Sequence, residues 1–262
     1  MNSRKWFLVS FTFLCFTWGR IALAQDEPRL VRVFVALADN KYQGIVPVPA
    51  ALGNGDDPAH NLYWGAAFGV RTFLRQSAEW KELSTTDHPN ASVMQRTIFR
   101  HAATGTILVA DAYHGREIKR AILDFYSSAA GMPREPIGLP GKENQGSLPQ
   151  VAALSVYVGH DGLMDFSIEK NFASAGKERR ETMILACASK AFFAPKLRGT
   201  GAEPVLWTTG LMAPEAYTLK AALDGWMINE SHEQIRQRAA AAYSHFQKCS
   251  LAAAQRLFSS TW

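Results

Sequence analysis

Apolar residues along the chain gather in short runs that end at polar residues, a pattern typical of strands and helices in alternation. Runs short enough to be buried strands cover residues 30–37, 106–111, 151–158, 183–186 and 204–208, and a further short strand is predicted at 80–84. Apolar positions at helical spacing predict helices over residues 62–75, 90–101, 117–130, 214–226 and 231–257, the last being a long C-terminal helix. We therefore predict an α/β fold, a three-layer αβα sandwich with a mainly parallel sheet of about six strands.

One loop interrupts this alternation. Residues 132–149 contain four prolines and three glycines and carry no strand or helix pattern. We expect a flexible loop, and three interpretations stay open: a cover for a site, a segment exposed to proteolytic processing, or a plain surface insertion.

The first 24 residues have the pattern of a signal peptide. Arg4 and Lys5 precede an apolar stretch over residues 6–18, and residues 22–24 are Ala-Leu-Ala, the small-x-small pattern that signal peptidase accepts. Because Gly19 and Arg20 interrupt the apolar stretch early, an uncleaved membrane anchor is the less favoured alternative. We expect an exported protein, periplasmic or secreted, with residues 25–262 forming a single domain that has no membrane association after cleavage.

Charge and motifs narrow the function classes. The formal net charge is +5, but removal of residues 1–24 takes away three basic residues and no acidic one, which leaves 25 basic against 23 acidic residues. We therefore expect no nucleic-acid partner. The chain has no Gly-x-Ser-x-Gly, His-Glu-x-x-His, phosphate-loop or dinucleotide motif, and its seven histidines are scattered. We expect no metal and no cofactor.

Polar residues follow the predicted strands, where a parallel sheet binds its ligands. These polar residues predict a polar C-terminal edge on an otherwise apolar sheet. They include Asp39, Lys41, His114, His160, Cys187 and Thr209.

Two of these strand ends carry a resemblance to a known family. The segment Val156-Tyr-Val-Gly-His-Asp-Gly162 ends a strand at a histidine turn, and Ile184-Leu-Ala-Cys187 ends the next strand at a cysteine. This order resembles the caspase-like cysteine peptidases, a group that includes caspases, metacaspases, legumains, gingipains and clostripain. Asp161 and Leu185 stand where the family usually has other residues. The resemblance implies a caspase-like domain that hydrolyses peptide bonds in a peptide or protein substrate.

The resemblance also implies roles for individual residues. Cys187 is the expected nucleophile and His160 the general base and acid, with Asp161 or Asp165 orienting the histidine. Backbone N–H groups of Cys187 and of the residues after His160 would form the oxyanion hole, and Gly162 would let the backbone approach the substrate.

Charge near this edge bears on the thiol and on the substrate. A helix beginning near Ser189, together with Lys190, is expected to favour the thiolate. Asp39 or Asp165 would favour a basic substrate side chain and Lys41 an acidic one. Thr209 completes the predicted substrate pocket.

Other interpretations of the same residues stay open. His114, in a His-Gly pair, is an alternative base, and His160 is alternatively a simple turn residue. Cys187 is alternatively a core residue or the disulfide partner of Cys249, although Cys249 fits the apolar stripe of the last helix. The corresponding alternative function is a non-enzymatic ligand- or partner-binding domain of the same fold. The oligomeric state is not predicted.

Overall fold

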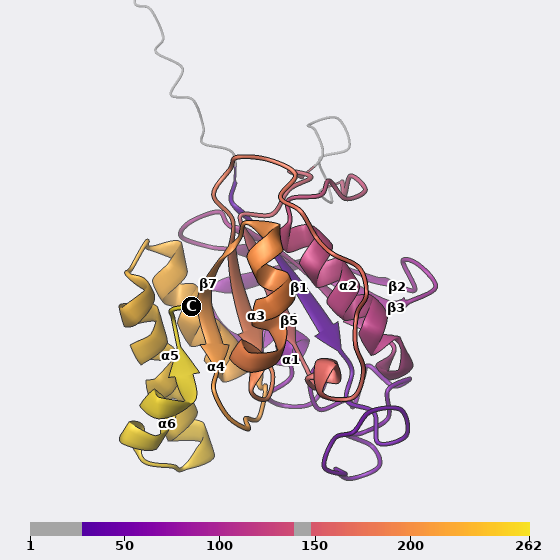
Figure 1. The fold of residues 1–262 in the computed structure, drawn as a ribbon. Coiled ribbons are helices and arrows are strands. Elements are labelled where there is room, and N and C mark those ends of the chain that lie inside the picture. The colour runs from indigo at the N-terminus through magenta and orange to yellow at the C-terminus, as the bar shows by residue number, and fades with distance from the viewer. Residues whose placement is uncertain (1–27, 139–147) are drawn as a thin grey trace, which may run out of the picture.

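The computed structural model describes residues 28–138 and 148–262, so the predicted signal peptide at 1–24 and residues 139–147 of the loop lie outside it. The described chain forms an eight-stranded sheet in the order β2-β3-β4-β1-β5-β6-β7-β8 (Figure 1). The strands are β1 (Leu30–Ala36), β2 (Trp80–Asp87), β3 (Val93–His101), β4 (Ile107–Tyr113), β5 (Leu154–Val158), β6 (Glu181–Leu185), β7 (Glu203–Thr208) and β8 (Phe258–Ser259). The five strands from β4 to β7 are mutually parallel, while β2, β3 and β8 run antiparallel to their neighbours. The predicted mainly parallel α/β sheet is confirmed, with eight strands instead of six.

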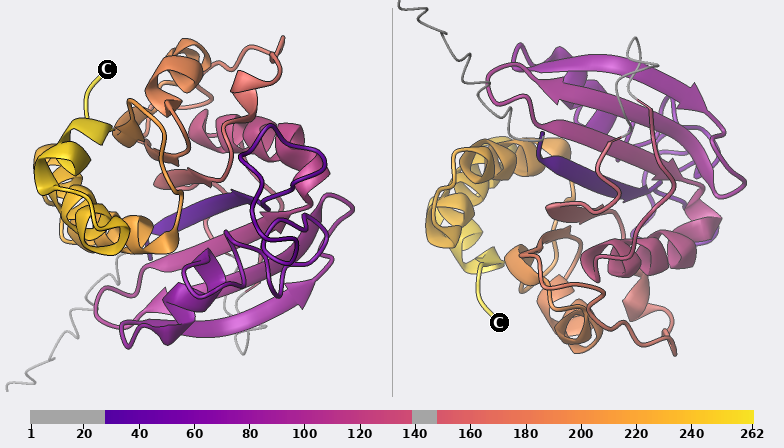
Figure 2. Two further views of the ribbon diagram at one scale, coloured as in Figure 1. Left: turned by 90° about the horizontal axis from the view of Figure 1, so that it is seen from below. Right: turned by 90° about the horizontal axis from the view of Figure 1, so that it is seen from above.

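Helices cover both faces of this sheet, as the views along it show (Figure 2). One face packs on α2 (Ile118–Ala129) and α3 (Ser189–Thr200), and the other on α1 (Val70–Gln76), α4 (Ala216–Met227) and α5 (His232–Gln247). A last helix, α6 (Leu251–Leu257), and two short 3-10 turns, η1 (Gly115–Glu117) and η2 (Gly162–Met164), complete the described elements.

The central strand β1 shows why the sequence predicts buried strands so directly. Val33 and Val35 belong to the core on the α1, α4 and α5 face, whereas Phe34 belongs to the core under α2 and α3. A parallel strand that is buried on both faces reads as a continuous apolar run. Arg32 is the one charged residue in this run, and its side chain is 2% exposed.

The prediction of a helix over residues 90–101 is wrong, because residues 93–101 form β3 between β2 and β4. The side-chain oxygen of Asn90 accepts hydrogen bonds from the N–H groups of Ser92 and Val93, which makes a turn before a strand instead of a helix cap. Apolar pairs at helical spacing also suit a strand whose two faces are both partly buried. Pairing with two neighbouring strands decides between the two structures.

Two other predicted helices are shorter in the structure. The segment 62–75 is helical only from Val70, and the preceding residues form turns. The long C-terminal helix is interrupted at Lys248, whose φ of 55° ends α5, and Ser250 caps α6. Cys249 lies in this connection, half-buried and packed against the core.

The start of α5 provides a stability prediction. The Ser231 side chain accepts a hydrogen bond from the N–H of Gln234, and the Gln234 side chain accepts one from the N–H of Ser231, which together form a capping box. Ser231→Ala is expected to lower the free energy of unfolding by about 1 kcal/mol, because it removes an acceptor for an unpaired helix N–H. Urea unfolding measures this change. Ser231→Thr keeps the hydroxyl and serves as the control, so an equal loss in both variants would contradict the assignment to the cap.

Candidate functional site

The ends of β5 and β6 bring the predicted histidine and cysteine to one place on the sheet. The two strands are parallel neighbours, and their register pairs Val158 with Leu185. His160 and Cys187 each follow two residues later, so both lie just beyond the C-terminal ends of neighbouring strands, at the lower edge in Figure 1. Neighbouring strands lie about 4.8 Å apart. This edge carries a thiol and an imidazole on adjacent strands, and their action as a pair stays a prediction.

His160 is held from two sides. Its ring is almost buried, and Nε2 lies 2.7 Å from Oδ2 of Asp165. The same carboxylate oxygen accepts a hydrogen bond of 3.1 Å from the N–H of Gly44. The His160 carbonyl accepts a hydrogen bond from the Tyr157 hydroxyl at 2.7 Å. A proton on Nε2, facing Asp165, leaves Nδ1 as the basic nitrogen, and the residues that the structure describes offer no hydrogen-bond partner to Nδ1.

Cys187 carries a half-buried, unbridged thiol, and Cys249 is likewise unbridged. The Cys187 sulfur lies 3.4 Å from the N–H of Met212, which donates to it, and 3.5 Å from the Met212 carbonyl. Burial first, and then its interaction with Cys187, raises the pKa of the Tyr63 hydroxyl. Across the described chain no hydrogen bond joins the sulfur to His160. The thiol thus contacts the loop after β7 in this structure.

The surroundings of the thiol differ in part from the sequence prediction. Helix α3 does begin at Ser189, directly after Cys187 and Ala188. The ammonium of Lys190, however, lies 3.2 Å from the Ser259 hydroxyl and over the Trp207 ring. These contacts direct Lys190 toward β7 and β8, and its predicted effect on the thiol stays a prediction.

Asp161 and Gly162 serve the turn itself. Oδ1 of Asp161 accepts the N–H of Leu163 at 3.0 Å, and Oδ2 is buried without a hydrogen-bond partner. Burial raises the pKa of the Asp161 carboxyl to about 7; the Leu163 N–H opposes this rise and the charge of Asp165 adds to it. The Gly162 N–H donates to the His160 carbonyl at 3.1 Å, and a Cβ at Gly162 would lie 2.8 Å from the Phe166 ring. Of the two predicted orienting carboxylates, Asp165 contacts the histidine. Gly162 contacts its own loop instead of presenting an oxyanion donor.

The three predicted substrate-pocket residues, Asp39, Lys41 and Thr209, each make contacts within the described chain. Asp39 is buried, and its Oδ1 accepts the N–H groups of Lys41 and Tyr42. The Lys41 ammonium lies over the Tyr42 ring at 4.7 Å in an exposed turn. The Thr209 hydroxyl donates to the Arg256 carbonyl at 2.9 Å, near the end of α6. These contacts place the three side chains in local turns and at a helix end, and their role in a substrate pocket stays a prediction.

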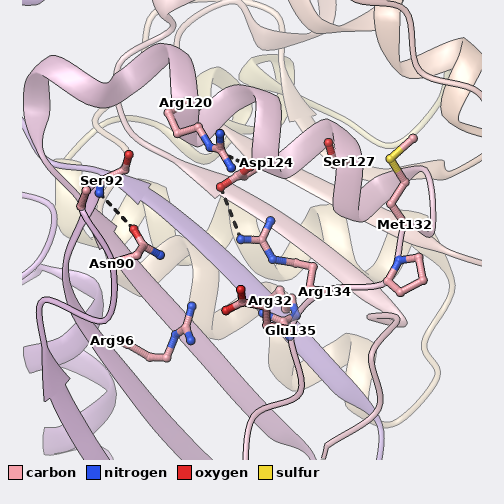
Figure 3. Close-up of a pocket in the computed structure, with 12 residues that line it drawn as sticks. Arg32, Asn90, Ser92, Arg96, Arg120, Asp124, Ser127, Met132, Arg134 and Glu135 are labelled. Atoms are coloured by element: carbon pink, nitrogen blue, oxygen red, sulfur yellow. Dashed lines mark hydrogen bonds and ion pairs between the residues drawn. The ribbon is translucent and has the colours of Figure 1, made fainter.

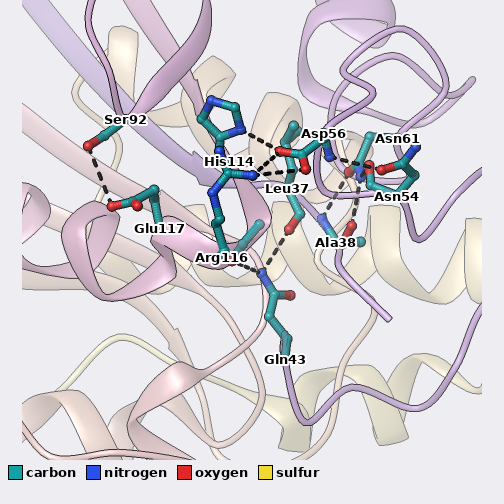
Figure 4. Close-up of polar contacts among 11 residues, drawn as sticks. Leu37, Ala38, Gln43, Asn54, Asp56, Asn61, Ser92, His114, Arg116 and Glu117 are labelled. Atoms are coloured by element: carbon teal, nitrogen blue, oxygen red, sulfur yellow. Dashed lines mark hydrogen bonds and ion pairs between the residues drawn. The ribbon is translucent and has the colours of Figure 1, made fainter. Parts of the chain in front are cut away.

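His114, the alternative base, lies too far along the sheet. It follows β4, and β1 and β5 separate β4 from β6. Three strand spacings correspond to about 14 Å. Its Nδ1 lies 2.5 Å from Oδ1 of Asp56, which also binds Arg116 through both carboxylate oxygens (Figure 4). The His114 hydrogen bond, with the Arg116 charge, lowers the pKa of Asp56. The His114–Asp56 contact therefore links the end of β4 to the loop after β1.

The sequence did not indicate two contacts of the site. Gly44 on the Asp165 carboxylate and Met212 on the Cys187 sulfur come from loops after β1 and β7. Neither loop carries a periodic pattern that would place it over the edge. The sequence predicts only that each loop follows a strand, and this does not show which residue the loop contacts.

No three His, Cys, Asp or Glu side chains within 28–138 and 148–262 are grouped so as to hold a metal ion. No described helix is both long and apolar enough to cross a bilayer. No family model, curated protein or solved structure matches the chain, so its own geometry carries the functional argument.

Proposed function

We propose that the chain is an exported cysteine peptidase of the caspase-like type, with Cys187 as nucleophile, His160 as base and acid, and Asp165 as the orienting carboxylate. The observation that supports this proposal is that the neighbouring parallel strands β5 and β6 end just before His160 and Cys187, with His160 Nε2 held by Asp165. A carboxylate on one ring nitrogen leaves the other to take the thiol proton and later to protonate the leaving amine.

Hydrolysis on this site would proceed through an acyl-enzyme. The Cys187 sulfur attacks the substrate carbonyl carbon, His160 protonates the departing amine, and water then releases the acid from the thioester. The backbone N–H of Cys187 is the proposed oxyanion donor. Before attack, the sulfur has to leave its contacts with Met212, because both backbone groups of that residue approach it. A shift of the loop after β7 on substrate binding would accomplish this.

A second function has its own supporting observation. The sulfur is held by Met212 and makes no hydrogen bond to His160 among the described contacts. This geometry favours a non-enzymatic domain that binds a partner at the same edge. Apo catalytic pairs are often looser than their substrate complexes, which is why we place the peptidase first.

Thiol labelling separates the two functions. In the peptidase, iodoacetamide is expected to alkylate Cys187 at least about tenfold faster than Cys249, because the thiolate is the reacting species and a neighbouring base increases it. Mass spectrometry of time points measures both rates. Cys187→Ala should remove the fast phase and all hydrolysis of a fluorogenic peptide library, and Cys249→Ala should preserve both. Equal slow labelling at both cysteines, with no hydrolysis, would instead indicate the binding domain.

A further inference from the structure

A cavity of about 510 Å³ lies over β1 and β3 and beside α2. Side chains of β1, β3, α2 and the segment after α2 converge on it (Figure 3). Its volume falls in the range of small-molecule sites, roughly 300–1,000 Å³. The cavity does not include either residue of the proposed catalytic pair.

Arginines dominate the charge of the cavity wall, with four of them against two carboxylates. Three of the arginines have carboxylate partners. Arg96 binds Asp111 through two hydrogen bonds of 2.6 and 2.8 Å, and Arg120 and Arg134 both pair with Asp124. The fourth arginine, Arg32, lacks such a partner among the described residues.

The Arg32 guanidinium is an unusual buried charge. The residue is 2% exposed, its Nε is buried without a hydrogen-bond partner, and within residues 28–138 and 148–262 it forms no ion pair. Burial, and then the charge of Arg134, lowers the pKa of Arg32 to about 10, while Asp111 opposes this shift. A buried charge without a partner is costly, and an anion placed against it would offset that cost.

Other cavity residues suit a small polar ligand. Asn90 uses its side-chain oxygen to accept two backbone N–H groups, which leaves its NH₂ group as a donor at the rim. The hydroxyls of Ser92 and Ser127 also line the cavity but donate to the Glu117 carboxylate and to the Leu123 carbonyl, and Met132 supplies an apolar wall. The planar fork of an arginine matches the oxygens of a carboxylate or a phosphate.

We propose that this cavity binds a small oxyanion, presented by a carboxylate or a phosphate group, with Arg32 as its principal partner. The site is independent of the proposed peptidase function, because it shares no residue with the His160–Cys187 pair.

Calorimetric titration of the purified chain tests the proposal, with sodium phosphate and sodium citrate as probes and sodium chloride at matched ionic strength as reference. At least one probe is expected to bind saturably. Arg32→Met should weaken that binding by about tenfold or more, because a charge-assisted pair is lost. Saturable binding of citrate alone identifies a carboxylate site, and saturable binding of phosphate alone identifies a phosphate site. Either outcome supports the proposal. No binding beyond the chloride reference overturns it.

Two further variants keep the test independent of folding. Glu135 is exposed, lines the cavity and has no ion-pair partner among described residues, so Glu135→Gln should tighten binding several-fold without touching the core. Arg75→Met removes an exposed arginine outside the cavity and should leave the affinity unchanged. Arg32→Met should also unfold in chloride no earlier than the wild type, since the substitution removes an unpaired buried charge. Unchanged affinity in both Arg32→Met and Glu135→Gln would overturn the proposal even if the anion binds.

Discussion

Replacing His160 by alanine is expected to lower kcat/KM for peptide hydrolysis by about 100- to 10,000-fold, the usual contribution of a general base. The expectation follows from the ring geometry. Asp165 holds Nε2 at 2.7 Å, so in the proposed mechanism Nδ1 takes the proton from Cys187. Without the ring, the thiol has to ionise unaided and the leaving amine has no proton donor. Steady-state kinetics on a peptide from the library provides the measurement.

Two companion variants decide whether the loss arises from catalysis. Asp165→Asn keeps the size of the side chain but removes the charge that favours a proton on Nε2, so its loss should be smaller than that of His160→Ala and should appear mainly in kcat. His114→Ala should retain activity, because β1 and β5 separate its strand from β6. A large loss in His114→Ala with little change in His160→Ala would contradict the assignment of the base.

The strands could be predicted because burial on both sheet faces leaves an uninterrupted apolar signal. β5 and β6 lie in consecutive runs that end at His160 and Cys187, and consecutive strands of an α/β sheet are often neighbours. The adjacency of these two strands therefore followed from the sequence. β3 did not, because Val93, Thr97 and Ile98 fit helical spacing equally well and only its pairing with β2 and β4 settles the conformation.

The details of the site depended on long loops. The Met212 and Gly44 contacts with the site come from segments without periodicity, and no local pattern predicts where such loops lie. Arg32 is different, because a single charge inside the apolar run 30–37 is visible in the sequence. An arginine inside a buried strand is costly unless a negative group lies near it, so this residue is the sequence signal for the cavity.

Replacing Asp161 by asparagine is expected to stabilise the protein more at pH 8 than at pH 5. Asp161 is fully buried, and its Oδ2 has no hydrogen-bond partner, which is why burial raises the pKa of this carboxyl to about 7. In the unfolded chain the pKa is near 3.8. Between these values the unfolded chain releases the proton and the folded protein keeps it.

The direction of the pH effect follows from this proton difference. Below about pH 4 the carboxyl is protonated in both states and has no pH-dependent effect on stability. As the pH rises toward 7, the unfolded state is favoured increasingly, and above 7 the loss of stability is complete. The asparagine side chain cannot ionise, so the Asp161→Asn variant escapes this loss. After allowance for residual solvation, its gain relative to the wild type should be about 1–2 kcal/mol larger at pH 8 than at pH 5.

Urea unfolding of the variant and the wild type at pH 5 and pH 8 measures this difference in stability gain. Burial of the asparagine NH₂ group has the same cost at both pH values, so this cost cancels in the comparison. Glu233→Gln is the matched control, because hydrogen bonds from Arg236 first and Gln237 second lower the pKa of Glu233 to about 2. Its titration in both states lies largely below pH 5, so its effect on stability should be nearly the same at pH 5 and pH 8. An Asp161→Asn effect that is equally independent of pH would show that Asp161 is ionised in the folded protein at pH 5. The turn after β5 would then hold a charged carboxylate next to His160, and Asp161 would compete with Asp165 as the source of negative charge near the imidazole.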